Sequence, residues 1–118
     1  MKIDKSLLSG STVLLVLALL EEQDQYGYQM IATLAQRSDH TFDLKEGTLY
    51  PILHTLESQG HVSSYESETP GGRKRKYYRL TRKGARLLAE KRAEWQQFAG
   101  AVERVLQPQR PLAQPAQA

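Results

Sequence analysis

The sequence predicts a mainly α-helical fold with a small β-hairpin in its second half and a long helix after the hairpin. Apolar residues recur at helical spacing through residues 9–59, and two alternating stretches flank a proline–glycine turn at residues 69–73. A heptad pattern then runs through residues 88–105, inside a helix expected over residues 82–106. The length of 118 residues and the hydrophobic content of 40% suit one compact domain.

The first two helices are predicted from apolar spacing. We expect one over residues 9–23, with Ser9 or Ser11 as its N-cap and a centre that is apolar on nearly every side, as in a helix at the middle of a core. The second is expected over residues 26–37. Its apolar positions, three and four residues apart, are Tyr28, Ile31, Leu34 and Ala35. Residues 38–45 are a predicted connection, with a short strand around residues 42–44.

The third helix is predicted over residues 47–59, with Gly60 as its C-terminal stop. Proline is tolerated in the first turn of a helix, so Pro51 predicts a start close to residues 47–50. The buried stripe is expected to contain Leu49, Ile52, Leu53 and Leu56. The opposite face carries almost no net charge and contains Gly47, Tyr50, Pro51, His54, Thr55 and Ser58.

Two strands are predicted next, over residues 61–68 and 74–80, joined by a flexible turn. In the second strand Tyr78 and Leu80 are expected to hold the hairpin to the core, while Tyr77 stays outward among cations. Thr81 is the predicted N-cap of a helix that ends near Leu106. Three helices followed by a hairpin is the order of a winged helix-turn-helix. In this fold the third helix is the recognition helix, which enters a groove of the DNA, and the hairpin is the wing.

The domain organisation follows from this order. We expect a winged helix-turn-helix DNA-binding domain over residues 1–81 and a dimerisation helix over residues 82–106. Residues 107–118 contain mainly Pro, Gln and Ala without periodicity, and this composition predicts a disordered tail.

Charge is distributed unevenly along the chain. Residues 1–70 carry four basic and ten acidic side chains, whereas residues 71–118 carry twelve basic and three acidic ones. The cations Arg73, Lys74, Arg75 and Lys76 follow two turn glycines and can donate hydrogen bonds to DNA phosphates. A solvated charged face and an anionic membrane surface are the alternatives, but a hairpin does not form the basic amphipathic helix that membrane binding requires.

Several function classes are disfavoured by composition. The chain has no cysteine, and His40, His54 and His61 are too scattered for a metal site, so neither a metal nor a cofactor is expected. No catalytic Ser/His/Asp or phosphate-loop pattern is present, and the protein is not expected to be an enzyme. The longest apolar run, Val13 to Leu20, is too short for a bilayer span, and we expect a cytoplasmic protein.

Three motifs in order resemble the PadR family of bacterial transcriptional regulators. They are "YGYQM" at 26–30, "GTLYPILHTLESQGHV" at 47–62 and "GGRKRKYYRLTRKG" at 71–84. The resemblance covers about residues 9–106, and the short length is similar to the smaller PadR subgroup, which includes multidrug-sensing repressors. It implies a homodimeric repressor without catalytic activity that binds inverted-repeat operators in double-stranded DNA.

The resemblance also implies site residues. Tyr26, Thr48 and Tyr50 are expected to contact DNA together with the wing cations, and His54 is an outward position that the family varies. For Tyr26 and Tyr50 the alternative is a packing role, and for His54 it is a solvated side chain. The runner-up functions are a winged-helix module for protein–protein contact and a drug-binding protein with little DNA binding.

The last helix carries a seam of apolar residues with nothing left in its own chain to cover it. Its members, interrupted by Lys91, are Leu88, Trp95, Phe98, Val102 and Val105. A second copy is the simplest partner, giving a twofold dimer, and folding back on its own domain is the alternative. Trp95 is expected either to anchor this interface or, as the drug-sensing subgroup implies, also to stack an aromatic small-molecule effector.

Overall fold

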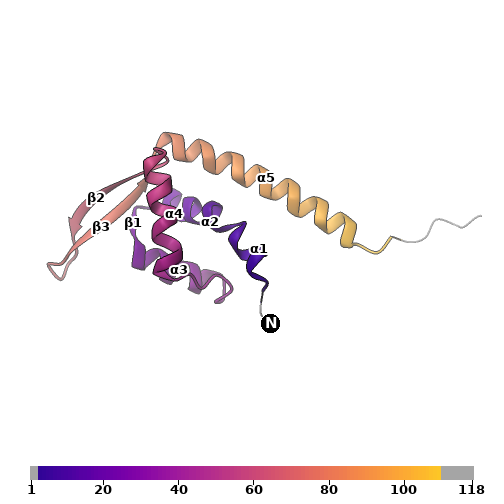
Figure 1. The fold of residues 1–118 in the computed structure, drawn as a ribbon, viewed down its shortest axis with the longest axis horizontal. Helices are drawn as coiled ribbons and strands as arrows, with labels where there is room; N and C mark the ends of the chain where they lie inside the picture. The colour runs from indigo at the N-terminus through magenta and orange to yellow at the C-terminus, as the bar shows by residue number, and fades with distance from the viewer. Residues whose placement is uncertain (1–2, 110–118) are drawn as a thin grey trace, which may run out of the picture.

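The structure, a computed structural model, describes residues 3–109 of the chain. Its elements in chain order are α1 (Lys5–Ser9), α2 (Thr12–Glu22), β1 (Gln25–Tyr26), α3 (Gly27–Arg37), α4 (Glu46–Ser58), β2 (Val62–Glu68), β3 (Lys74–Leu80) and α5 (Arg82–Leu106). Figure 1 shows the β2–β3 hairpin on one side of the helical body and α5 extending past the other side. The predicted fold class, a winged helix-turn-helix followed by a long helix, is confirmed.

Helix α2 lies at the centre of the core, as its uniformly apolar sequence predicts. Val16 and Leu17 have no exposed surface, and every other element except α1 and β1 adds at least one side chain to the same cluster. Burial of each large apolar side chain contributes about 1.5–3 kcal/mol. The remaining cluster members are Leu19, Leu20, Met30, Leu34, Leu49, Leu53, Leu56, Val62, Tyr78 and Leu88.

The start of the chain contains a helical turn that the sequence analysis missed. Asp4 caps α1 by accepting a hydrogen bond from the Ser6 backbone N–H at 2.9 Å, and this bond, together with one from the Ser6 hydroxyl, lowers the pKa of Asp4. Ser11 occupies the N-cap position of α2, but its hydroxyl donates to the Leu7 carbonyl instead of capping. Helix α2 therefore begins from a preceding helix rather than from a loop.

Three of the four apolar positions predicted for α3, Ile31, Leu34 and Ala35, pack in or against the core, and the fourth does not. Tyr28 was placed in the apolar stripe, yet it is 61% exposed, and the buried positions are Gly27, Met30, Leu34 and Ala35. The ring of Tyr50 occupies the space beside Gly27, where a Cβ would overlap the phenol. The absence of a side chain at Gly27 therefore makes room for the Tyr50 ring, and the spacing of apolar residues in the sequence cannot indicate such a contact.

The hairpin is part of a larger sheet than predicted. Strand β1 pairs antiparallel with β3 through Gln25 opposite Tyr78 and Tyr26 opposite Tyr77, giving the order β1-β3-β2. The Gln25 side chain, 1% exposed, donates to the Leu19 carbonyl and fixes β1 to the end of α2. A two-residue strand has too few positions to show alternation, and so the sequence did not reveal it.

Two further predictions around α4 are wrong. Residues 42–44 form no strand; the backbone there is irregular, and the Phe42 N–H donates to the Ser38 hydroxyl. Helix α4 begins at Glu46, one residue before the predicted start, and this places Pro51 in its second turn instead of its first. The helix ends as predicted, because Gly60 adopts a φ of 81° and the His61 N–H donates to the Leu56 carbonyl at 2.8 Å.

The start of α5 is attached closely to the end of α4. Thr81 is the N-cap, as predicted, and accepts from the Gly84 N–H at 3.0 Å while its hydroxyl donates to the Gly60 carbonyl at 2.7 Å. Lys83 donates to the Gln59 carbonyl at 2.7 Å. Gly84 lies directly against the His61 carbonyl and leaves no room for a Cβ. We call this set of contacts the α4–α5 junction.

The end of the described chain follows α5. Gln107 is the C-cap of α5, and residues 110–118 of the predicted tail lie outside the described residues. Within residues 3–109, no helix has both the length and the apolar character needed to cross a bilayer.

Gly84→Ala should destabilise the fold, because its methyl group would overlap the His61 backbone carbonyl. Overpacking of this kind costs about 1–3 kcal/mol. Thermal unfolding followed by circular dichroism measures the loss. Gly47→Ala is the matched control, since no heavy atom lies within 4 Å of its Cβ position, and it should leave stability unchanged or slightly higher. Equal unfolding midpoints for the two variants would contradict the role of the junction.

Candidate nucleic-acid interface

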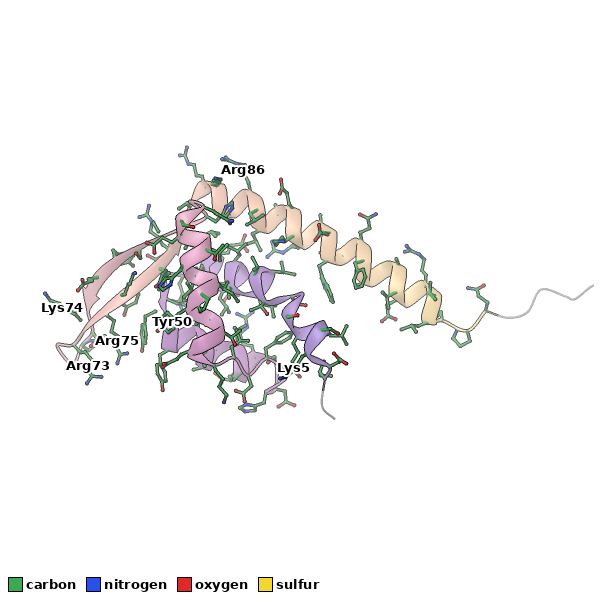
Figure 2. All side chains as sticks on the ribbon, in the orientation of Figure 1. Lys5, Tyr50, Arg73, Lys74, Arg75 and Arg86 are labelled. Atoms are coloured by element: carbon green, nitrogen blue, oxygen red, sulfur yellow. The ribbon has the colours of Figure 1, made fainter. Side chains whose placement is uncertain are left out.

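The candidate interface combines α4, the start of α3 and the hairpin, which we call the wing. Figure 2 shows Arg73, Lys74 and Arg75 near the wing tip, with Tyr50 on the neighbouring α4 and the free end of α5 far from all of them. The wing tip is a tight turn in which Gly72, with a φ of 82°, donates its N–H to the Thr69 carbonyl at 2.8 Å. A φ of this sign favours glycine.

Most of the predicted outward face of α4 is exposed. Thr48 and His54 are both solvent-accessible, as are the other outward residues Gly47, Pro51, Thr55 and Ser58. Tyr50 is the exception, because its ring packs against Gly27 at the start of α3. Burial, followed by the nearby Glu46 carboxylate, raises the pKa of Tyr50. The structure therefore places Tyr50 in a packing position that joins the two helices, with part of its surface still accessible.

Three tyrosines form a row across the outer face of the sheet. Tyr26 on β1, Tyr77 on β3 and Tyr65 on β2 are neighbours in the strand register. The Tyr65 and Tyr77 rings stack at 5.7 Å between centroids, and the Tyr26 ring meets Tyr77 edge-on at 5.4 Å. Tyr77 lies on the outer face between Arg75 and Arg79 in the strand, as predicted, and is half-buried because the other two rings flank it. Aromatic pairs of this geometry stabilise by about 0.5–1.5 kcal/mol each.

Tyr65 closes the tyrosine row and was missed by the sequence analysis. Its hydroxyl donates to the Asp24 carboxylate at 2.6 Å, which links β2 to the residue before β1. That hydrogen bond raises the pKa of Tyr65. Its position in the alternation of β2, on the face opposite the buried Val62, was the available signal.

The wing cations fall on two different faces. Glu66 is opposite Lys76 and Glu68 is opposite Lys74, and directly opposed side chains share a face. The Lys76 ammonium also lies 3.9 Å from the Glu57 carboxylate of α4. The two lysines therefore have acidic neighbours.

The arginines of the wing have different surroundings. Arg75 is opposite Ser67, and its guanidinium lies 4.5 Å from the centroid of the Tyr26 ring. Arg79 is opposite Ser63 on the same face, and Arg73 lies in the turn. No acidic residue of β2 is directly opposite Arg75 or Arg79, although the Asp24 carboxylate, which accepts from Tyr65, lies on this face. Arg75 therefore keeps more of its positive charge than the two lysines. The contact with Tyr26 fixes the direction of Arg75.

The seam of α5 is exposed over most of its length. Leu88 was predicted to join it, but Leu88 has no exposed surface and lies in the core of its own chain. Trp95, Phe98, Val102 and Val105 are 47%, 56%, 38% and 84% exposed. Trp95 and Phe98 border two open grooves of about 450 and 500 Å³ between α5 and the α1–α2 segment, both lined by Leu7 and Leu14 as well.

Within residues 3–109, no group of three or more His, Asp or Glu side chains is arranged to hold a metal ion. His54 lies on α4, while His40 follows α3 and His61 precedes β2. The side chains that the structure gathers here are mainly aromatic and cationic, and a basic surface of this kind is typical of nucleic-acid binding.

Fold and surface together define a winged helix-turn-helix transcriptional regulator. Residues 16–90 match the family described as the Transcriptional regulator PadR-like family, and the chain belongs to this family. The match covers the body from α2 through the wing and the first turns of α5.

The chain is also similar to relatives and to solved structures, two of which are described as transcriptional regulators. An uncharacterized protein X of Lysinibacillus sphaericus is 37% identical over 81 residues, covering 69% of this chain and 74% of that protein. The transcriptional regulator YqjI of Escherichia coli is 31% identical over 72% of this chain, which spans only 39% of its length. A transcriptional regulator from Clostridium thermocellum has a TM-score of 0.81 and 30% identity, covering 89% of this chain and 99% of that one.

Asp24→Ala should lower the pKa of Tyr65 toward its ordinary value, because the carboxylate that holds the phenolic proton is removed. In the wild type the pKa is raised in the folded state, so the stabilisation is present below about pH 10 and is lost as the pH rises through that higher pKa. An NMR titration of the tyrosine rings measures both proteins. Tyr50, whose pKa is raised mainly by burial, serves as an internal control that should not move. An unchanged Tyr65 pKa would argue against the link to Asp24.

Proposed function

We propose that this protein is a homodimeric repressor that binds an inverted-repeat operator in double-stranded DNA. The observation that carries the proposal is the pairing of an exposed, nearly neutral face on α4 with a wing on which Arg75 faces a serine of β2, whereas Lys74 and Lys76 face glutamates. A helix face of small side chains can enter the major groove closely, while cations beside it contact phosphates. Helix α4 is then the recognition helix, with Thr48 and His54 near the bases.

Each wing and sheet residue has a part in this proposal. Arg73 and Arg75 supply the strongest phosphate contacts, and Lys74 and Lys76 add weaker ones because glutamates partly neutralise them. Tyr26 fixes the direction of Arg75 and, being only half-buried, keeps a surface for the DNA backbone. Tyr50 sets the angle between α3 and α4 and presents its remaining accessible edge to the DNA.

Dimerisation is proposed from the seam of α5. Trp95, Phe98 and Val102 lie along one side of the helix, next to exposed Leu7 of α1. A monomer with this many large apolar side chains exposed along one line has the composition of an interface, where tryptophan is enriched. The winged helix-turn-helix unit up to Thr81 is then the DNA-binding domain, and residues 82–106 form the dimerisation helix.

A small-molecule effector is a second element of the proposal. Trp95 and Phe98 line both grooves between α5 and the α1–α2 segment, and their ring centroids are 6.2 Å apart. Volumes near 500 Å³ are in the range of sites for drug-sized ligands, and two aromatic faces suit an aromatic ligand. In a twofold dimer, the grooves of the two copies would meet at the interface, where a ligand could change the distance between recognition helices.

The wing proposal predicts a difference between two variants of equal charge. Wild-type protein should select an inverted repeat from a pool of random duplexes, with affinity that falls steeply with salt. Arg73→Gln with Arg75→Gln should reduce the slope of log affinity against log salt by about 2, as for two lost phosphate contacts. Lys74→Gln with Lys76→Gln should reduce it less. Fluorescence anisotropy at four salt concentrations measures all three proteins.

Equal slopes for the two double variants would show that the glutamates opposite Lys74 and Lys76 do not weaken the phosphate contacts of these lysines relative to those of the arginines. A wild-type protein that selects no duplex would refute DNA binding itself. It would favour the alternative of a protein–protein module or a ligand-binding protein.

The dimer proposal predicts that charge on the seam separates the two copies. Phe98→Glu with Val102→Glu should give a monomer, because two carboxylates would be buried without partners in the interface. The monomer should also lose operator affinity, since it contacts one half-site only. Light scattering and DNA binding measure the two effects.

The matched control is Gln96→Glu with Gln97→Glu, which adds the same charge on the side of α5 away from the seam. It should remain dimeric. A Phe98→Glu, Val102→Glu protein that is dimeric at the wild-type concentration would place the interface elsewhere.

A further inference from the structure

Pro51 occupies a position in α4 that folding alone disfavours. It is the sixth residue of a 13-residue helix, and proline in a helix interior both removes a hydrogen bond and crowds the preceding turn. The side chain is exposed, and the core positions beside it are taken by Leu49 and Leu53. Burial in the core therefore does not explain a proline here, and exposed positions that break a local folding rule are often functional.

The proline changes the chemistry of the helix surface at Gly47. In an α-helix the carbonyl of residue 47 accepts from the N–H of residue 51, and proline has no N–H. Gly47 is exposed, and no heavy atom lies within 4 Å of the place where its Cβ would be. We call the surface formed by these two residues the Gly47–Pro51 step. It contains the Gly47 carbonyl, which lacks the N–H donor of a regular helix, beside exposed backbone and the apolar proline ring.

This step lies at the outermost part of α4. With 100° per residue, Gly47, Pro51 and Ser58 project opposite the buried Leu49, Leu53 and Leu56. Because Gly47 has no side chain, another molecule can approach the backbone closely at this point. The nearest polar side chains on the same line, His54 and Ser58, are one and two turns farther along the helix.

The chemistry of this surface matches one base pair better than the others. A carbonyl only accepts hydrogen bonds, so in the major groove it can pair with the amino group of adenine or cytosine and is repelled by the acceptors of guanine. A proline ring can contact the methyl group of thymine, which a G·C pair lacks. An A·T pair is the pair that offers both an amino donor and a methyl group.

We propose that Pro51 is a specificity-determining residue, which frees the Gly47 carbonyl to accept from adenine while its ring contacts a thymine methyl group. Each half-site then carries an A·T pair beneath the Gly47–Pro51 step. The proposal rests on the proposed function, in which α4 enters the major groove. It adds a backbone acceptor to the side chains that read the operator.

The test is Pro51→Ala, measured for both stability and base preference. Alanine restores the N–H donor to the Gly47 carbonyl and removes the ring, so the unfolding midpoint should rise. For the wild type, replacing the contacted A·T pair of the selected operator by G·C should lower affinity by roughly 5- to 100-fold, the usual range for one mismatched pair. For Pro51→Ala that difference should fall to about twofold or less, while replacements at other pairs keep their effects.

Gly47→Ala provides a second variant that keeps the proline. It should fold normally, because its methyl group meets no neighbour, yet bind the operator more weakly since the methyl group hinders close approach. His54→Ala is the control on the same face; it should change preference at a different base pair and leave the A·T preference intact.

Two outcomes would overturn the inference while wild-type operator binding is intact. One is a Pro51→Ala protein with an unchanged penalty at every base pair. The other is a lower unfolding midpoint for Pro51→Ala, which would assign the proline to folding. A wild-type protein that selects no duplex would overturn the proposed function first, and this inference with it.

Discussion

The contact between Gly84 and the His61 carbonyl sets the direction in which α5 leaves the body. Because a Cβ has no space there, the first turn of α5 can lie closer to the end of α4 than any side chain would allow. The hydrogen bonds of Thr81 and Lys83 to the carbonyls of Gly60 and Gln59, directly after α4, hold the two helices at that contact. Leu88, one turn farther along α5, then enters the core.

This junction has a consequence for the proposed dimer. If α5 joins two copies, the angle at the junction determines the distance between their α4 helices. That distance has to match the spacing of the two half-sites, one turn of B-DNA, with little error. The ion pair between Arg92 and Glu21, 3.1 Å long, lies farther along α5 and adds a solvent-exposed brace to α2. A ligand bound beside Trp95 would act on the recognition helix through the same junction, because the hydrogen bonds of Thr81 and Lys83 connect α5 to the end of α4.

The wing illustrates how register changes the meaning of a charge run. In the sequence, Arg73 to Lys76 form one uniform block of cations. Strand alternation separates them, and the pairing with β2 then places Glu66 and Glu68 beside the lysines alone. The arginine face instead receives the tyrosine row, whose members come from three strands. Charge alone therefore indicated a polyanion-binding wing, while pairing decided which cations have their charge partly neutralised.

Much of the fold was predictable because local signals and tertiary packing agree. The apolar centre of α2, the proline–glycine turn of the wing and the Thr81 cap each specify their element through residues close in sequence. The exposed face of α4 was predictable for the same reason, since helical geometry alone places Pro51 and Ser58 opposite Leu49 and Leu53.

What the sequence by itself determined is the order of elements, the family resemblance and the location of the cationic wing, because each depends on neighbouring residues and their periodicity. The tertiary structure decided the rest: Leu88 turns into its own core, Tyr50 fills the space beside Gly27, and β1 completes the sheet. These features join residues that lie more than twenty positions apart in the chain, and the contact of Tyr50 also depends on the missing side chain of Gly27. Their contribution to stability depends on how side chains from different elements fill the space between them, which no local sequence pattern encodes.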